Sequence, residues 1–468
     1  MPDRALPRSL WAIWWNAILL LRPAFSRLRT FMWFVTAVAG LTVRLELLGV
    51  TSIVRALNLR PRLYTKLLAH FHSSGIKLDR LSAWWAQTVL QLFPSPVRVK
   101  GRLVLVGDGI KAPKRGKKMP AVKLLHQQSE SNTKPEYIMG HSMQAVGLLV
   151  HAANSVFSVP LAVRIHEGLV WSNRDKRSLL DKMLGLLDIL AIKVPFYFVA
   201  DAYYAVGKMV RGLLKQGNHL VTRVKSNTVA YAPATPKKGQ KKKGRPKTYG
   251  QKKKLKSLLK DPKSMLQVAS PVYGEHNVIL RYCVRDLLWR PVGLLVRFVA
   301  VIHPTRGACI LMCTDTTLSA VDIIRLYGLR FKIECNFKQA VRQIGSFAYH
   351  FWMVPPAQIG RLPKPRQTQN ARLSCLHSGW RRRPGTAPVS RCRCPQACLG
   401  LVRVLAANHS SRYPAIGVGR RKRPAPDTSR FSPGSRKNQF SHEIHHRSAG
   451  HAKYADFPLG FVIKKTDS

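Results

Sequence analysis

The sequence predicts an α/β protein with an N-terminal helical domain and a β-rich insertion in its second half. Three features of the hydrophobic pattern predict this class. Apolar positions recur at helical spacing up to about residue 95, and short apolar runs alternate with helical segments from about 96 to 219. From about 220 to 316 the apolar positions alternate as in strands, with Pro and Gly between them. Strands interleaved with helices are typical of an α/β sheet.

The N-terminal domain, residues 1–95, is predicted to be helical from runs such as LLGVTSIVRALNL and YTKLLAHFH. Its most apolar segments, 11–21 and 31–43, are shorter than the roughly 20 residues that a membrane-spanning helix needs. The start of the chain, with Asp3 and Arg4, also lacks the pattern of a signal peptide. We therefore expect buried or amphipathic helices and no membrane contact.

Two aspartates follow apolar runs in the segment 96–219. The run LVLV stops at Gly107-Asp108-Gly109, and the run FYFVA stops at Asp201. Each pattern predicts a buried strand with an acidic residue at its carboxyl end, so parallel strands would bring both carboxylates to one edge of a sheet. Between these two runs the sequence predicts a further strand around 145–152 and a helix around 176–190.

The predicted β-rich insertion, residues 220–316, contains the stretches VILRYCV and LLVRFVAVI. It also contains the basic run KKGQKKKGRPKTYGQKKKLKSLLK. Direct phosphate contact and a merely solubilising surface are equally good interpretations of this run. Trp289 could stack on an extruded base, although a core or surface tryptophan is the favoured interpretation.

The segment 317–354 is predicted to be helical and carries Glu334, with Arg330 and Lys338 one turn away on either side. Positions four apart lie on one face of a helix. A metal-binding carboxylate would then sit between two cations able to contact phosphates. An ordinary surface ion-pair ladder explains this segment, taken alone, equally well.

Asp108, Asp201 and Glu334 together would suit a site for two divalent cations, because hard cations such as Mg²⁺ prefer carboxylate oxygens. Two such cations about 4 Å apart promote hydrolysis or transfer at a phosphodiester bond. A single Asp after a strand is more often a turn or capping residue. The prediction therefore depends on the three acids jointly.

The composition predicts a polyanionic partner. The chain has 78 Lys and Arg against 21 Asp and Glu, a formal net charge of +57. Nucleic acid is the expected partner, and an anionic membrane surface is the alternative. All eight cysteines lie in the second half without a repeated pair spacing, which suits a reducing cytoplasm.

Two groups of residues would allow a zinc site. Cys392, Cys394 and Cys398 lack a second half-site, so an incidental cluster is the favoured interpretation. For His126 and His141, structural hydrogen bonds are favoured over zinc binding.

The segment YGLRFKIECNFKQAVRQIG resembles the Tyr-x2-Arg-x3-Glu signature of DDE transposases of bacterial insertion sequences, through Tyr327, Arg330 and Glu334. The family signature has Lys seven positions after the Glu, where this chain has Val341, with Lys338 and Arg342 nearby. The stretches LVGDGIKAPKRGKKMPAVKLLHQQSESNTKPEYIMGHS and FYFVADAYYA resemble the regions of the first and second aspartates.

This resemblance covers roughly residues 10–354 and implies a ribonuclease-H-like catalytic core interrupted by a β-rich insertion. It implies that Asp108, Asp201 and Glu334 are the catalytic residues and bind two Mg²⁺ or Mn²⁺ ions. It also implies cleavage at insertion-sequence ends, strand transfer into target double-stranded DNA, an N-terminal DNA-binding domain and, from the pairing of two ends, a homodimer in the bacterial nucleoid. The expected DNA contacts are Tyr327, Arg330, Lys338, Arg342, Trp289 and the basic residues after the first aspartate, Lys111, Lys114, Arg115, Lys117 and Lys118; a solvated loop explains the last five about as well.

Residues 355–468 form a basic tail rich in Arg, Pro, Ser and Cys, in which amphipathic periodicity disappears. We hypothesise a frameshift near residue 354, with a genuine disordered DNA-binding tail as the alternative. Translation of the gene in its other two frames decides between them. A catalytically defective transposase that only binds DNA, and a two-metal nuclease of repair or RNA processing, are the competing functions.

Overall fold

The computed structural model describes residues 9–46, 49–71, 73–114, 122–126, 136–152, 154–166, 177–234, 247–260 and 265–346. The basic tail, the hypothesised frameshift position, Cys392, Cys394 and Cys398 lie outside these residues. So does part of the basic run, residues 237–246.

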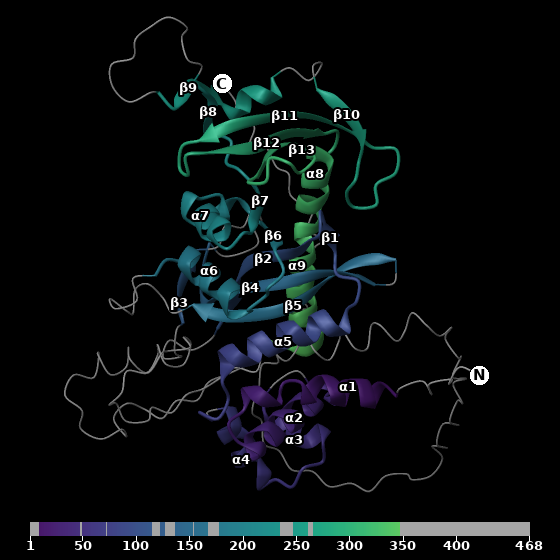
Figure 1. Ribbon diagram of the computed structural model, residues 1–468. Coiled ribbons are helices and arrows are strands. Elements are labelled where there is room, and N and C mark those ends of the chain that lie inside the picture. Colours follow the sequence, from purple (N-terminus) through teal and green to yellow (C-terminus); the bar gives the residue numbers. More distant parts are fainter. Residues whose placement is uncertain are drawn as a thin grey trace, which may run out of the picture.

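The N-terminal segment is helical, as its periodicity predicts. It forms α1 (Leu10–Leu19), the 3-10 turn η1 (Arg22–Ala24), α2 (Leu28–Val43), α3 (Thr51–Ala56), α4 (Leu63–Phe71) and α5 (Leu78–Leu92). These helices gather at one end of the molecule, with α5 nearest the sheet (Figure 1). The indole of Trp85 in α5 donates a hydrogen bond to the Pro160 carbonyl at 2.9 Å, which ties this end to the sheet. None of the helices in the described residues is long and apolar enough to cross a membrane.

The strands of the described residues form one mixed sheet of 13 strands. Its main order is β3-β4-β2-β6-β7-β13-β12-β11-β8-β9, while β1, β5 and β10 pair with β2, β4 and β11. The first strands are β1 (Arg98–Val99), β2 (Arg102–Pro113), β3 (Lys123–His126), β4 (Tyr137–Ala152), β5 (Ser155–His166), β6 (Phe196–Ala200) and β7 (His219–Arg223). The later strands are β8 (Val229–Pro233), β9 (Tyr249–Lys254), β10 (Leu266–Ala269), β11 (Ile279–Trp289), β12 (Leu294–His303) and β13 (Gly307–Cys313).

Strands β2 and β6 run parallel, as the two-aspartate pattern requires, with Val106 paired to Val199. The prediction that β2 ends at Asp108 is wrong. The strand continues to Pro113, because the long strand β4 stays paired with it as far as Gly140. Asp108 therefore lies within β2, past its last pairing with β6.

The β-rich insertion extends the central sheet instead of forming a separate layer. Strand β13 pairs with β7, with Met312 opposite Thr222, and β12, β11 and β8 follow outward. The expected start of the insertion at residue 220 falls inside β7. The 3-10 segment η3 (Leu255–Leu259) follows β9.

The two faces of the sheet are covered by different helices. Helices α6 (Leu179–Ile189) and α7 (Gly207–Lys215) and the N-terminal helices contribute to one core cluster. The other core contains the apolar residues of a nearly continuous helical segment, made of α8 (Ala320–Gly328), the 3-10 turn η5 (Leu329–Phe331) and α9 (Lys332–Gln339). A π-helical segment, Ala340–Ile344, follows. Figure 1 shows α8 and α9 as one column that runs from the insertion strands across β2, β4 and β5.

Candidate active site

The alternation of side chains along β2 and β6 decides where the two aspartates point. In β2, Leu103 and Leu105 belong to the core that includes α6 and α7, whereas Val104 and Val106 belong to the core beneath α8 and α9. Since side chains alternate between the faces of a strand, Asp108 shares the face of Val104 and Val106.

The same alternation applies to β6, where Tyr197 and Val199 contribute to the core beneath α8 and α9. Asp201 therefore lies on that side as well. Continuing the parallel register two residues past Val106 and Val199 brings Asp108 beside Asp201. Both acids thus face the helix that carries Glu334.

The backbone around each aspartate is fixed by local contacts. A Cβ on Gly107 would lie 2.2 Å from the Phe198 ring, so the residue before Asp108 has room only for glycine. The Asp108 Oδ1 atom accepts a hydrogen bond from the Gly109 amide at 2.7 Å.

Asp201 is held from two sides. It caps the 3-10 turn η2 (Ala202–Tyr204), accepting from the Tyr203 amide at 3.1 Å. The buried hydroxyl of Thr222 in β7 donates to the Asp201 carbonyl at 2.6 Å. The position of Asp201 therefore depends on two neighbouring strands, β6 and β7.

Arg330 joins the third acid to the first. Its Nη1 atom lies 3.1 Å from Asp108 Oδ2, and its Nη2 atom lies 2.7 Å from Glu334 Oε1. The Arg330–Glu334 pair is the one-turn ion pair that the sequence allowed. Asp108 is far less exposed than Glu334, with side chains 19% and 50% exposed. One guanidinium therefore bridges acids from a strand and from a helix distant in sequence.

The acids are short of positive charge. Burial raises the pKa of Asp108 to about 7; the charge of Arg330 opposes this rise, and the charges of Asp201 and Glu334 add to it. Burial also raises the pKa of Asp201. The charge of Arg330 again opposes this rise, and the charge of Glu334 adds to it. Burial lowers the pKa of Arg330, but its ion pairs with Glu334 and Asp108 outweigh this and leave it above its ordinary value. Three acids that influence one another therefore share a single cation.

This donor set fits a hard divalent cation, because Mg²⁺ and Mn²⁺ prefer carboxylate oxygens and an excess of negative charge. Within the described residues, however, no group of three His, Cys, Asp or Glu side chains is arranged to hold a metal as it stands. The Arg330 guanidinium occupies Asp108 and Glu334 instead. A cation shared by all three acids would require Arg330 to withdraw from at least one of them.

Two buried polar residues beside the aspartates have no counterpart in the sequence-based prediction. Gln144 lies opposite Gly109 in β4, and its amide nitrogen donates to the Tyr204 hydroxyl at 3.3 Å and to the Leu179 carbonyl at 3.0 Å. Burial, and then the charges of Asp108 and Asp201, raise the pKa of Tyr204. The stretch ADAYYA contained Tyr204, but only the strand register could have revealed Gln144.

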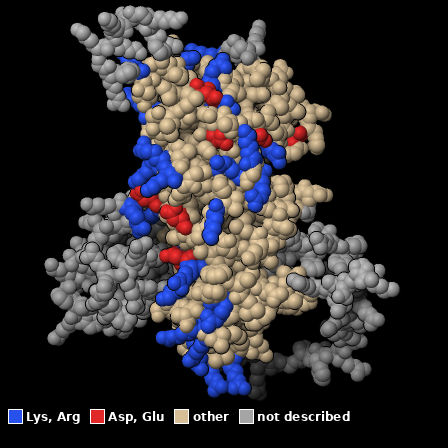
Figure 2. Space-filling view, viewed as in Figure 1, with Lys and Arg blue, Asp and Glu red and all other residues tan. Residues whose placement is uncertain are grey.

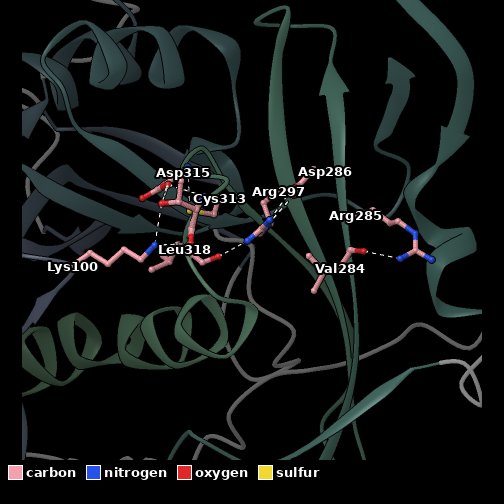
Figure 3. A network of polar contacts seen from close by, with 9 residues as sticks. Lys100, Val284, Arg285, Asp286, Arg297, Cys313, Asp315 and Leu318 are labelled. Atoms are coloured by element: carbon pink, nitrogen blue, oxygen red, sulfur yellow. Dashed lines mark hydrogen bonds and ion pairs between the residues drawn. The ribbon is translucent and has the colours of Figure 1, made fainter. Parts of the chain in front are cut away.

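The turn before α8 is anchored by a polar network (Figure 3). The Asp315 carboxylate accepts hydrogen bonds from the Tyr197 hydroxyl at 2.6 Å and from the Thr317 amide at 2.9 Å. Burial alone would raise the pKa of Asp315, but these donors lower it to about 2. Lys100 and Arg297 donate to the carbonyls of Thr317 and Leu318, and Arg297 also pairs with Asp286. The start of the helical segment is therefore fixed to the sheet.

The expected DNA-contacting residues on this segment differ in exposure. Lys338 and Arg342 are exposed on α9 and the π-helical segment. Tyr327 is half-buried, and burial raises its pKa to about 12. Arg330 is engaged by the two acids. The segment thus offers two exposed cations and one neutral phenol near the carboxylates.

The other residues expected to contact DNA are in part buried or outside the described residues. Lys111 is exposed and donates to the His126 carbonyl, but Lys114 is buried. Arg115, Lys117 and Lys118 lie outside the described residues. Trp289 is only 5% exposed and packs in the core, which favours the packing interpretation over base stacking.

The two histidines considered for zinc lie within the described residues, whereas the cysteines considered for it, Cys392, Cys394 and Cys398, lie outside them. His126 lies 3.3 Å from Glu136, and His141 is fully buried. Four thiols, those of Cys283, Cys309, Cys313 and Cys335, are free. This is consistent with structural roles for both histidines.

Comparison with known proteins supplies a family. Residues 21–291, more than half of the chain, match the family described as DDE superfamily endonuclease. The matched segment includes Asp108 and Asp201 and ends before the helix that carries Arg330 and Glu334. No curated protein gives a significant match to the chain.

Proposed function

Because the chain belongs to the family described as DDE superfamily endonuclease, we propose that it is a transposase that cleaves DNA at insertion-sequence ends and joins those ends to other DNA. The membership itself gives a nuclease-type function. The observation that carries the finer proposal is the arrangement of the acids: Asp108 and Asp201 share one face of the sheet, and Arg330 links Asp108 to Glu334.

The carboxylates of Asp108, Asp201 and Glu334 would hold two divalent ions, Mg²⁺ or Mn²⁺. When bound, such ions activate an attacking oxygen and stabilise the leaving oxygen of a phosphodiester. The strand-borne aspartates are fixed by Gly109, Tyr203 and Thr222, as described above. Glu334 is the more exposed ligand on a helix, so it is the one better able to adjust its position.

Arg330 and Tyr327 would bind the phosphate that is cut. A guanidinium carries five N–H donors, and the two acids engage only part of this set. With its pKa raised to about 12, Tyr327 stays protonated at neutral pH and donates a hydrogen bond. Lys338 and Arg342, one and two turns beyond Glu334, would contact phosphates further along the strand.

The wider DNA contact would be electrostatic. In Figure 2 the Lys and Arg side chains form a broken band along the length of the visible face, and acidic side chains occur in only a few places. Basic surfaces of this kind bind phosphates without sequence preference. The N-terminal helices and a second copy of the chain, pairing two DNA ends, would supply end recognition.

A cleavage assay on DNA carrying the inverted repeats of the element tests the proposal. Wild type should nick this DNA only with Mg²⁺ or Mn²⁺. Asp108→Ala, Asp201→Ala and Glu334→Ala should each reduce nicking at least about 100-fold and change DNA affinity by less than about threefold, because basic residues supply most of the affinity. Asp188→Ala is the control, since Asp188 is an exposed acid on α6, a helix that packs in the other core cluster. Near-normal nicking by any of the three variants would remove that acid from the site.

The second candidate is a defective transposase that binds DNA without cutting it. It is favoured by the ion pairs of Arg330, whose guanidinium engages Asp108 and Glu334. End-specific binding without metal-dependent nicking would establish it. Metal-dependent nicking that ignores the inverted repeats would instead favour a general two-metal nuclease.

A further inference from the structure

A loop of the insertion contacts the helical segment that carries Arg330 and Glu334. It comprises residues 270–278, between β10 and β11, and is called the clamp loop here. A hydrogen bond of 2.8 Å from the Ser270 amide to the Val278 carbonyl closes its base. Tyr273 and Asn277 have φ angles of 58° and 59°, in the left-handed region that side-chain-bearing residues seldom adopt. Such a conformation persists only where the surroundings hold it.

The clamp loop packs where α8 passes into η5. A Cβ on Gly328, the last residue of α8, would lie 2.3 Å from Val272 Cγ1, so the backbone of the helix and the loop are in close contact. The Tyr273 ring lies 5.4 Å from the Phe331 ring. The two contacts fall on either side of Arg330 in the chain.

A mostly buried network of charged side chains connects the clamp loop to the end of β12 and the turn after it. Glu275 accepts hydrogen bonds from the Ser270 hydroxyl at 2.7 Å and from Arg306 Nε at 3.0 Å. Backbone amides donate to His303 Nδ1, which leaves Nε2 to donate to Glu275 at 3.0 Å. The Arg306 guanidinium also lies 4.2 Å from the centre of the Tyr273 ring. Glu275 and Arg306 thus hold Tyr273 against η5.

We propose that the clamp loop is a positioning element of the active site, in which Val272 and Tyr273 set the place of Arg330 and, through it, of Asp108 and Glu334. This inference rests on the proposed function for its catalytic consequence. Its physical basis is that α8 and α9 meet through a 3-10 turn, where the helical hydrogen bonds are less regular and packing decides the path of the chain. The insertion would thereby contribute to the geometry of the carboxylates without touching the substrate.

Replacement of the Tyr273 ring tests this role. Tyr273→Ala should slow nicking at saturating DNA about tenfold, the upper end of what one lost aromatic contact accounts for, with a change in KM for DNA below about threefold. Tyr273→Phe keeps the ring and should retain nearly full activity. Tyr231→Ala is the matched control, because Tyr231 lies in the same insertion and its ring pairs with that of Tyr249 at 5.3 Å. Gly328→Ala should imitate Tyr273→Ala by forcing Val272 away.

Two readouts separate positioning from general stability. In an Arg330→Lys background, Tyr273→Ala should reduce the nicking rate by less than about twofold, because its effect passes through Arg330. Hydrogen exchange of the full chain provides the second readout, which needs no activity: Tyr273→Ala should speed exchange of the amides of residues 329–334 about tenfold, and Tyr231→Ala should not. The positioning role is overturned if Tyr273→Ala leaves amide exchange at residues 329–334 unchanged. It is also overturned if the effects of Tyr273→Ala and Arg330→Lys on the nicking rate are fully additive. Absence of nicking by wild type would instead count against the proposed function and leave the exchange result to decide on the clamp loop.

Discussion

The charge and contacts of the active-site acids depend most on one residue, Arg330. It pairs with Asp108 and Glu334 at once, yet burial and the neighbouring acids still leave the pKa of Asp108 at about 7. A carboxyl that is half-protonated at neutral pH is a poor metal ligand until it loses its proton. Metal binding and the protonation of Asp108 should therefore be linked.

This linkage gives a pH prediction. The pKa of Asp108 is raised from 3.8 to about 7, so a proton must leave the carboxyl below pH 7 before it can bind a cation. Mn²⁺ affinity, measured by calorimetry, should rise about tenfold per pH unit below pH 7 and level off above it. Asp108→Asn should bind weakly and without this dependence, while Glu46→Gln should follow wild type. A wild-type affinity that stays constant between pH 6 and pH 8 would contradict the linkage.

At the residue scale, the sequence predicts acids that the structure brings near one another, but it does not predict which residues contact them. The run FYFVA predicts a strand that stops at Asp201, and Asp201 caps the 3-10 turn that follows β6. The bridge from Arg330 to Asp108 joins residues 222 apart, and Gln144 meets Tyr204 only through strand pairing. Contacts of this kind depend on the register of distant strands, which local periodicity does not encode.

At the scale of elements, β6 has the bounds that its apolar run predicts, whereas β2 extends past its predicted end at Asp108. A short-range signal, Gly-Asp-Gly, favoured a turn there, but pairing with β4 prevailed. The helical periodicity after Ser319 was likewise sufficient to predict α8 and α9. It was insufficient to predict the 3-10 turn between them, which begins directly after Gly328, the residue that packs against Val272.

The polar network before α8 gives a prediction about this element. The folded-state pKa of Asp315, about 2, lies below the ordinary 3.8, so its contribution to stability is present above about pH 4 and is lost as the pH falls toward 2. A shift of nearly two pKa units corresponds to about 2.5 kcal/mol, and solvent screening reduces this, so Asp315→Asn should lower the free energy of unfolding by about 1–2 kcal/mol at pH 7.

Urea unfolding at a series of pH values checks this prediction. The difference between wild type and Asp315→Asn should shrink as the pH is lowered from 5 toward 2.5. Asp188→Asn serves as the control, since Asp188 is exposed on α6, and it should change stability little at any pH. If the difference in free energy of unfolding between wild type and Asp315→Asn grew as the pH fell, the pKa of Asp315 would not be lowered by this network.

At the scale of the whole molecule, one continuous sheet joins the insertion strands to the strands that carry the aspartates. The α8–α9 segment crosses it from the insertion end, so the glutamate reaches the aspartates only through the packing of both parts (Figure 1). The hydrophobic pattern predicted an α/β sheet and a β-rich insertion. It could not predict their fusion, because the pairing of β13 with β7 is a long-range contact.

The net charge of +57 gives a prediction for the whole chain. Binding that releases counterions from 6 to 10 phosphates should weaken by a factor of about 10³–10⁵ between 50 and 200 mM salt. Fluorescence anisotropy with a labelled duplex measures this dependence. The variants Asp108→Ala and Glu334→Ala should leave its slope unchanged, because the acids make no phosphate contacts. A weak salt dependence in wild type would mean that the basic surface is not the DNA-binding surface.

The most direct test of the shared metal site is a crystal structure of the protein with Mn²⁺ and a transposon-end duplex, in which anomalous scattering locates the ions. We expect two Mn²⁺ peaks about 4 Å apart, ligated by Asp108, Asp201 and Glu334, with Arg330 turned from at least one acid toward a phosphate. Ions bound elsewhere, or Arg330 still bridging Asp108 and Glu334 with DNA in place, would contradict it.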